Sequence, residues 1–311
     1  MGDKSELQHI PRAVDALVLS EARSSLIARA RKDAAEIVRD GRYFATFISS
    51  HSLNALIART VFAIAGHECK EPWYHYRLDC ALLIISSGSL TMVATDGRRL
   101  SIVKRPNELN QEIEGERRVL IPRDIVHRLQ TLLPDTNADK VGFANEGNTF
   151  SFRLGQETLS WTKAEGAFPD YETTMPKGFG SFSLVNAGKL SAAIRRVIQI
   201  EPRTWGWEAR QNIIRLSLGE KELKIGPMPT EFFEEFAESI DTSYSGDPRM
   251  VGLNADLILD FFGALGDTDE VRIGYVEINT VEKARPSPAI CIENIGLDCR
   301  ILYIVMSYKL D

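Results

Sequence analysis

The chain has 311 residues, a length typical of about two domains. Hydrophobic residues make up 44% of it and charged residues 26%, the proportions of an ordinary globular protein. The net charge of −6 excludes a surface that is basic throughout, so any contact with nucleic acid has to come from a local basic face.

The first part of the chain is predicted to be helical. Apolar residues recur at helical spacing over residues 11–40, between Pro11 as a start and Gly41 as a stop. The same spacing predicts a helix over Leu53–Ala65. Short apolar runs then predict strands at Leu82–Ile85, Leu90–Ala94 and Leu100–Val103.

A hairpin turn is predicted between the last two of these strands. Thr95-Asp96-Gly97 joins them, and Asp-Gly accepts the positive φ of a tight turn. Pro122 is expected at the first position of a helix that runs to Leu133. Further strands are predicted at Val141–Phe143, Phe150–Leu154 and Thr158–Thr162, before the turn-rich segment Gly166–Tyr171.

An internal repeat relates the two halves of the chain. The segments 122–133 and 254–265 match at an offset of 132 residues, with Val126 opposite Ile258 and Leu129 opposite Phe261. Each segment follows an arginine and a short apolar strand, and each precedes an acidic turn and another strand. The Leu53–Ala65 helix has its counterpart at Leu190–Ile200. The repeat predicts an α+β fold of two modules, each with two helices packed on antiparallel sheets.

Searches for catalytic and metal-binding motifs point away from an enzyme. The sequence has no phosphate-binding G-x-x-x-x-G-K-[ST] and no H-E-x-x-H zinc motif. His67, Cys69 and His75 are better explained as a polar loop than as metal ligands. We expect no catalytic residue, no metal and no cofactor.

The cysteines and the apolar runs bear on the expected location. The four cysteines form no C-x-x-C pair, which fits a reducing cytoplasm better than a disulfide scaffold. The charged Met1–Glu6 segment does not resemble a secretory signal, and runs such as Ala81–Ile85 are too short to span a membrane. A cytoplasmic protein that does not enter membranes is expected.

Aromatic and basic residues alternate in two clusters, Trp73–Arg77 and Arg203–Arg210. Rings beside guanidinium groups can stack on bases and neutralise phosphates, but loop anchoring or an interface is an alternative explanation. Basic residues also lie on predicted helices, where a solvated face is the alternative. The candidate DNA-binding residues are Tyr76, Arg77, Arg123, Arg195, Arg196 and Arg203.

Three segments, in order, resemble motifs of the bacterial DNA polymerase III beta sliding clamp family. Val93–Leu100 resembles the family's V-A-T-D-G-H-R-L hairpin, with Arg98 in place of the histidine. Gly166–Tyr171 resembles its G-x-F-P-D-Y segment, and Tyr303–Leu310 resembles its Y-V-V-M-P-M-R-L ending. The resemblance covers about residues 44–311 and implies the family's second and third domains.

The resemblance implies a non-catalytic scaffold whose helices line a channel around duplex DNA. It also implies that DNA polymerase and other clamp-binding-motif proteins insert a short peptide between the two domains, and a clamp loader is a further candidate partner. The alternative that we keep open is a peptide-binding adaptor that does not encircle DNA. The partner-peptide pocket, carried over by position, comprises Leu78, Thr95, Gly97, Arg98, Arg99, Leu100, Pro176, Asn254, Ile304, Met306 and Tyr308.

The resemblance also divides the chain and suggests its assembly. Residues 1–43 are expected to form a helical segment in place of the family's first domain, followed by one clamp module at 44–177 and another at 178–311. Bacterial clamps of this family close a ring from six modules. Three chains of two modules would supply that number, so we expect a homo-oligomer and favour a trimer.

Overall fold

The structure is a computed structural model that describes residues 44–66, 76–109, 112–113, 115–176, 180–200, 212–228, 236–278, 286–295 and 299–310. The predicted helix over 11–40 and most of both aromatic clusters, including Trp73 and Arg203, lie outside the described residues. The metal ligands considered at His67, Cys69 and His75 lie outside them too. None of the helices in the described part of the chain has the length and hydrophobicity of a membrane span.

The described residues of the first module form eight strands and two α-helices. In chain order they are β1 (Phe44–Ser49), α2 (Ser50–Ala58), β2 (Cys80–Ile85), β3 (Ser89–Thr95), β4 (Arg99–Pro106), β5 (Arg117–Pro122), α3 (Arg123–Leu132), β6 (Lys140–Glu146), β7 (Thr149–Leu154) and β8 (Glu157–Thr162). Two short 3₁₀ helices accompany them, η1 (Val61–Ala63) after α2 and η2 (Tyr171–Thr174) after β8. Residues 163–176, which we call the connector, lead to the second module.

The second module repeats this order. Its elements are β9 (Ser183–Asn186), α4 (Ala187–Ile200), β10 (Ile213–Leu218), β11 (Glu222–Pro227), β12 (Glu238–Asp241), β13 (Arg249–Asn254), α5 (Ala255–Phe262), β14 (Glu270–Ile278), β15 (Ser287–Ile295) and β16 (Arg300–Met306), with β17 (Tyr308–Lys309) added at the end. The pairing repeats as well, because β5-β2-β3-β4 corresponds to β13-β10-β11-β12, and β1-β6-β7-β8 corresponds to β9-β14-β15-β16. The predicted α+β duplication is confirmed.

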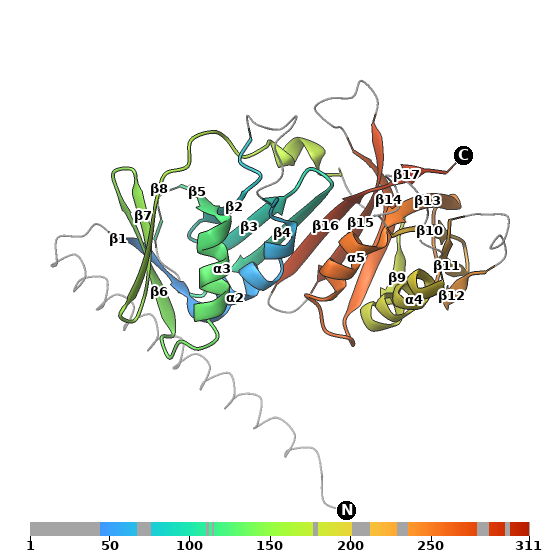
Figure 1. The fold of residues 1–311 in the computed structure, drawn as a ribbon, viewed down its shortest axis with the longest axis horizontal. Coiled ribbons are helices and arrows are strands. Elements are labelled where there is room, and N and C mark those ends of the chain that lie inside the picture. The colour runs from blue at the N-terminus through green and yellow to red at the C-terminus, as the bar shows by residue number, and fades with distance from the viewer. Residues whose placement is uncertain are drawn as a thin grey trace, which may run out of the picture.

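A single central sheet joins the two modules. Its strand order is β5-β2-β3-β4-β16-β15-β14-β9, so half of it comes from each module (Figure 1). The join is the antiparallel pair β4–β16, which runs from Arg300 opposite Lys104 to Val305 opposite Arg99. We call this pair the seam. Backbone hydrogen bonds across the seam make the two modules one continuous body.

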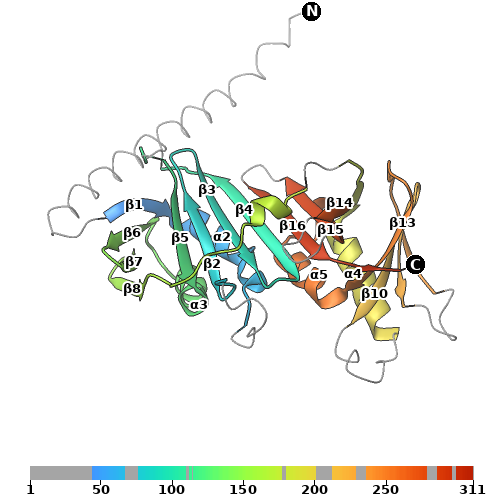
Figure 2. The ribbon, with the colours of Figure 1, turned by 90° about the horizontal axis from the view of Figure 1, so that it is seen from above.

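The α-helices of the described residues pack on one face of the central sheet. Helix α2 contacts α3, and α4 contacts α5. The large core between helices and sheets contains Leu83 of β2 and Tyr303 of β16. Figures 1 and 2 show the helices of both modules on the same side. A face lined by helices from both halves is therefore built into the duplication.

The other face of the central sheet carries a second apolar cluster. Side chains alternate between the faces of a strand, so Leu82, Leu100 and Ile304 point away from the helices. Phe168 and Tyr171 of the connector pack on this cluster. The connector thus crosses the outer face of the sheet, where it can border a binding site.

Local chemistry explains most helix boundaries. The side chain of Asn254 accepts hydrogen bonds from the backbone N–H groups of Asp256, at 3.0 Å, and Leu257, which caps α5. Pro122, expected at the first helical position, is instead the last residue of β5 and the cap residue of α3. Its fixed φ suits the extended backbone at the end of β5, so the helix starts one residue later.

The predicted helix at Leu53–Ala65 is shorter than expected. Helix α2 ends at Ala58, and the chain continues through a turn into η1. The hydroxyl of Thr60 donates a 2.8 Å hydrogen bond to the carbonyl of Leu56, a bond that competes with regular helix propagation. The β-branched pair Thr60-Val61 also lowers helix propensity.

Candidate functional site

A pocket lies beside the seam, at the end of the central sheet where the connector crosses. Its lining includes eight of the eleven residues that the sequence assigned to a partner-peptide pocket. We call it the seam pocket, and its lining residues are Leu78, Thr95, Gly97, Arg98, Arg99, Leu100, Pro169, Asp170, Tyr171, Thr174, Ile278, Ile304 and Met306. Side chains from both modules and from the connector therefore meet in one place.

The β3–β4 turn forms one wall of the seam pocket and is held by its own side chains. Asp96 Oδ1 accepts hydrogen bonds from the backbone N–H groups of Arg98, at 2.9 Å, and Arg99, at 3.1 Å. Gly97 has a φ of 85°, as the sequence predicts for this turn. The Thr95 hydroxyl donates to the carbonyl of Arg99 at 2.6 Å. These bonds present a preformed turn to the pocket.

Arg99 connects this wall to the second module. Its guanidinium pairs with Asp96 at 3.0 Å and with Asp260 of α5 at 2.7 Å, while its side chain is only 9% exposed. It also donates to the carbonyl of Phe62 and lies over that residue's ring, 5.5 Å from the centroid. Arg99 thus contacts the β3–β4 turn, η1 and α5. The same side chain therefore stabilises the pocket wall and the junction between the modules.

Below Arg99, two aromatic rings fill the core at the seam. Tyr303 of β16 stacks on Phe261 of α5 at 4.6 Å between ring centroids. The Tyr303 hydroxyl donates a 2.6 Å hydrogen bond to the carbonyl of Leu257. Burial raises the pKa of this phenol, so it stays neutral and acts as a donor. These contacts join β16 to α5 beneath the seam.

The seam pocket is mostly apolar inside and polar at its edge. Leu78, Leu100 and Ile304 are buried, and Met306 is half-buried. Asp170 and Arg98 are exposed at the edge. Such a combination suits an extended peptide that places apolar side chains in the pocket and keeps its backbone near polar groups.

Three residues assigned to the pocket from sequence lie elsewhere. Pro176 lines a neighbouring pocket together with Met175. Asn254 is 8% exposed and caps α5. Tyr308 is half exposed on β17, opposite Gly252 of β13. Position in a motif did not reveal which way these side chains turn.

Other lining residues were missed by sequence reasoning. The segment Gly166–Tyr171 was recognised as a motif, yet Pro169, Asp170 and Tyr171 were not assigned to the pocket. Ile278 comes from the end of β14 and is brought close through β15 and β16. The Gly166–Tyr171 motif could have pointed to the connector residues, whereas no recognised motif contains Ile278.

The candidate DNA-binding residues divide into two groups. Arg123 begins α3, where its Nε donates to Nε2 of His127 at 3.1 Å. Arg195 and Arg196 are exposed on α4, and Arg196 forms a bidentate pair with Glu238 at 2.8 and 2.9 Å. These three belong to the helices that cover one face of the central sheet.

Tyr76 and Arg77 instead hold the connector. Tyr76 forms an isolated bridge with Ala167, and the Arg77 N–H donates to the carbonyl of Ala167 at 2.9 Å. The Arg77 guanidinium forms a bidentate pair with Asp79 at 2.7 and 2.8 Å. The bond from Arg77 lowers the pKa of Asp79 below its ordinary value.

Comparisons with known proteins agree with this architecture. The family described as DNA polymerase III beta subunit, central domain, matches residues 47–170. The beta sliding clamp of Pseudomonas aeruginosa is 30% identical over 227 residues, which are 72% of this chain and 57% of that protein. The beta sliding clamp of Vibrio cholerae is 25% identical over 263 residues, or 85% of this chain and 65% of that protein.

Solved structures give the same result. A crystal structure of the DNA polymerase sliding clamp from Pseudomonas aeruginosa with ligand superposes with a TM-score of 0.69 and 26% identity, covering 86% of this chain and 67% of that one. The beta subunit from Thermotoga maritima has the same TM-score at 18% identity and supports the fold alone. On the agreement of motifs, module order and fold, the chain belongs to the beta sliding clamp family.

Proposed function

We propose that this chain is a sliding clamp-like processivity scaffold that associates with duplex DNA and tethers polymerase or repair proteins. It carries no catalytic activity of its own in this proposal. The observation that supports it most is the seam pocket, where apolar side chains of both modules converge beside a preformed turn. An apolar pocket with a polar edge favours capture of short peptides from partner proteins.

Peptide binding tests this proposal. Leu100→Ala with Met306→Ala should abolish binding of a fluorescent peptide that carries two large apolar anchors, since losing each anchor contact costs about 2 kcal/mol. Leu184→Ala with Met250→Ala is the matched control, because it truncates the same residue types where they are about half exposed. Fluorescence anisotropy gives the affinities and circular dichroism the folded state. Unchanged binding by the folded pocket variant would refute the pocket assignment.

DNA is proposed to lie along the face that is lined by the helices of both modules, which we call the helix face. Arg123 and Arg195 offer positive charge there, and contacts to phosphate need no base sequence. Loose contacts of this kind permit sliding. The net charge of −6 favours DNA binding through one basic face rather than through the whole surface.

Assembly into a ring is proposed from the module edges. At the seam, the edge strand β4 of the first module pairs with β16, the last repeated strand of the second. The strands that correspond to them, β12 and β8, end their sheets within the described residues. Pairing of β12 in one chain with β8 in the next would repeat the seam between chains, and three chains would close a ring at about 120° each. A closed ring would need opening on DNA, the role proposed for a clamp loader.

A non-encircling adaptor is the second candidate function. It is favoured by the length of β12, which has four residues where β4 has eight, and so offers a smaller edge for ring closure. Retention on DNA separates the two functions. A ring assembled on closed circular duplex should stay bound in high salt and leave after linearisation, whereas an adaptor should dissociate equally from both.

A further inference from the structure

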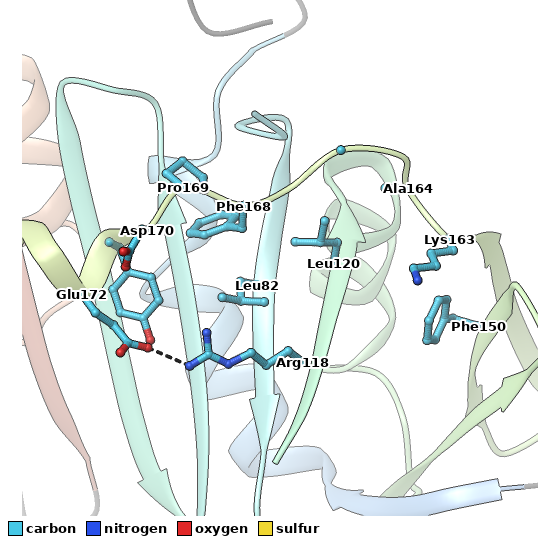
Figure 3. A pocket seen from close by; sticks show the side chains of 12 residues that line it. Leu82, Arg118, Leu120, Phe150, Lys163, Ala164, Phe168, Pro169, Asp170 and Glu172 are labelled. Atoms are coloured by element: carbon cyan, nitrogen blue, oxygen red, sulfur yellow. Dashed lines mark hydrogen bonds and ion pairs between the residues drawn. The ribbon is translucent and has the colours of Figure 1, made fainter. Parts of the chain in front are cut away.

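A second pocket lies on the other side of the connector, with a volume of about 380 Å³ (Figure 3). It lies between the connector, strands β2 and β5, and the β7–β8 hairpin of the first module. We call it the connector pocket, and its lining residues are Leu82, Arg118, Leu120, Phe150, Lys163, Ala164, Gly166, Phe168, Pro169, Asp170, Tyr171 and Glu172.

The interior of the connector pocket is apolar and held in place. Leu82 and Leu120 project from neighbouring strands, and Phe168 lies above them on the connector (Figure 3). Phe150, at the other end, stacks on Trp161 with ring centroids 5.7 Å apart. The Trp161 Nε1–H donates a 3.0 Å hydrogen bond to the carbonyl of Leu120. The pocket is therefore formed before any ligand arrives, which reduces the entropy cost of binding.

The edge of the connector pocket carries two separated cations. Arg118 is about half exposed and pairs with Glu172 at 2.7 Å. Lys163 lies at the opposite end, next to Phe150, and is exposed (Figure 3). Arg118 also pairs with Glu116 at 3.6 Å, and Asp170 lies at the same end of the pocket (Figure 3), so the charges there are already balanced. An acidic group on a ligand would therefore complement the Lys163 end.

The two pockets are adjacent parts of one surface. Pro169, Asp170 and Tyr171 line both of them, so only the width of the connector separates them. The connector is held on both sides of these residues, because the Arg77 guanidinium donates to the carbonyl of Glu165 at 3.2 Å and Arg118 pairs with Glu172 at 2.7 Å. An extended peptide advances about 3.3 Å per residue, so a few residues beyond an anchor in the seam pocket would reach across.

We propose that the connector pocket is a second subsite for the same partner peptide. It takes an apolar or aromatic side chain from the residues that flank the segment bound in the seam pocket, with an acidic residue beside Lys163. This inference rests on the peptide-binding function proposed for the seam pocket. The bound peptide would cross the connector on its way from the seam pocket to the connector pocket.

Peptides of two lengths test the proposal. The short probe carries two large apolar anchors, and two long probes add Asp-Asp-Phe-Gly at its N-terminus or Gly-Phe-Asp-Asp at its C-terminus. One long probe should bind the wild-type chain about tenfold more tightly than the short probe. Lys163→Glu and Leu120→Ala should each remove most of this gain and leave the affinity for the short probe unchanged. Lys221→Glu, an exposed lysine on the β10–β11 turn, is the matched control.

The outcomes distinguish this inference from the function on which it rests. If the short probe binds but neither long probe gains affinity, or if the gain survives both variants, the second subsite is refuted and the seam pocket stands. If no probe binds and the seam pocket variants change nothing, the proposed function itself fails. Lys163→Glu alters an exposed side chain, so the test does not depend on the stability of Leu120→Ala.

Discussion

The two modules share a core but differ on their exposed helix surfaces. Val126 and Leu129 of α3 and their counterparts Ile258 and Phe261 of α5 are all buried. Both helices expose an aspartate at matching positions, Asp124 and Asp256, but α3 exposes Arg128 where α5 exposes Asp260. Asp260 pairs with Arg99 beside the seam. Helix α5 therefore supports the seam, whereas α3 presents a cation to solvent at the same position.

The modules also differ in how their edges are used. The edge β4 has eight residues, pairs across the seam and borders a pocket. The equivalent edge β12 has four residues and ends its sheet within the described part of the chain. The same fold therefore supplies one edge that is committed to an intramolecular contact and one that is paired with no further strand of the described residues.

The largest expected effect concerns the role of α5 at the seam. Arg99→Ala should lower the free energy of unfolding by about 3 kcal/mol, because it removes a nearly buried guanidinium and leaves the mostly buried Asp96 carboxylate without its cation. Arg118→Ala is the matched control. Its pair with Glu172 is equally short at 2.7 Å, but both side chains are about half exposed, so the loss should stay below about 0.5 kcal/mol. Urea unfolding measures both, and equal losses would contradict the special role of the seam.

The next effect concerns DNA binding by the side of the central sheet that the helices cover. Arg195→Glu should weaken duplex binding several-fold at low salt and reduce the slope of affinity against salt by about one ion. Lys104→Glu is the control, because Lys104 lies on β4 in the alternation of Leu100 and Ile102 and so on the opposite face of the sheet. Fluorescence anisotropy across a salt series measures both. Equal weakening by the two variants would show that DNA does not select the helix face.

The smallest effect concerns the ion pair that holds the connector. Arg77–Asp79 is intermediate in exposure between the pairs of Arg99 and Arg118. The bond from Arg77 depresses the Asp79 pKa, so the stabilisation is present above the ordinary value of 3.8 and is lost as pH falls through the depressed value. Asp79→Asn should cost about 0.5 kcal/mol at pH 7 and progressively less as the pH falls below 3.8. Urea unfolding at pH 7 and at a series of acidic pH values measures this, and a loss that does not change with pH would contradict it.

Much of the fold could be predicted because the signals are local. Thr95-Asp96-Gly97 marks its turn by the φ that glycine permits, and the paired apolar positions of α3 and α5 reveal the duplication. The end of α2 could not be predicted in the same way. The hydroxyl of Thr60 and the capture of the Phe62 carbonyl by Arg99 depend on contacts made in three dimensions.

The candidate site was predictable in part for a similar reason. Arg99, Leu100, Ile304 and Met306 lie in motifs, and their strands pair directly at the seam. Tyr308 lies in the same C-terminal motif but is placed by its pairing with β13, away from the pocket. Ile278 reaches the pocket only through the order of strands across the sheet. Sequence spacing shows which residues share a strand, but not which strands become neighbours.

We expect the seam between modules to be repeated between chains, through β12 and β8. Native mass spectrometry over a range of micromolar concentrations reveals such an assembly. A ring of three chains gives a species of three chain masses whose population rises with concentration. A single chain mass at every concentration would contradict the ring and leave the adaptor as the function of this clamp-like chain.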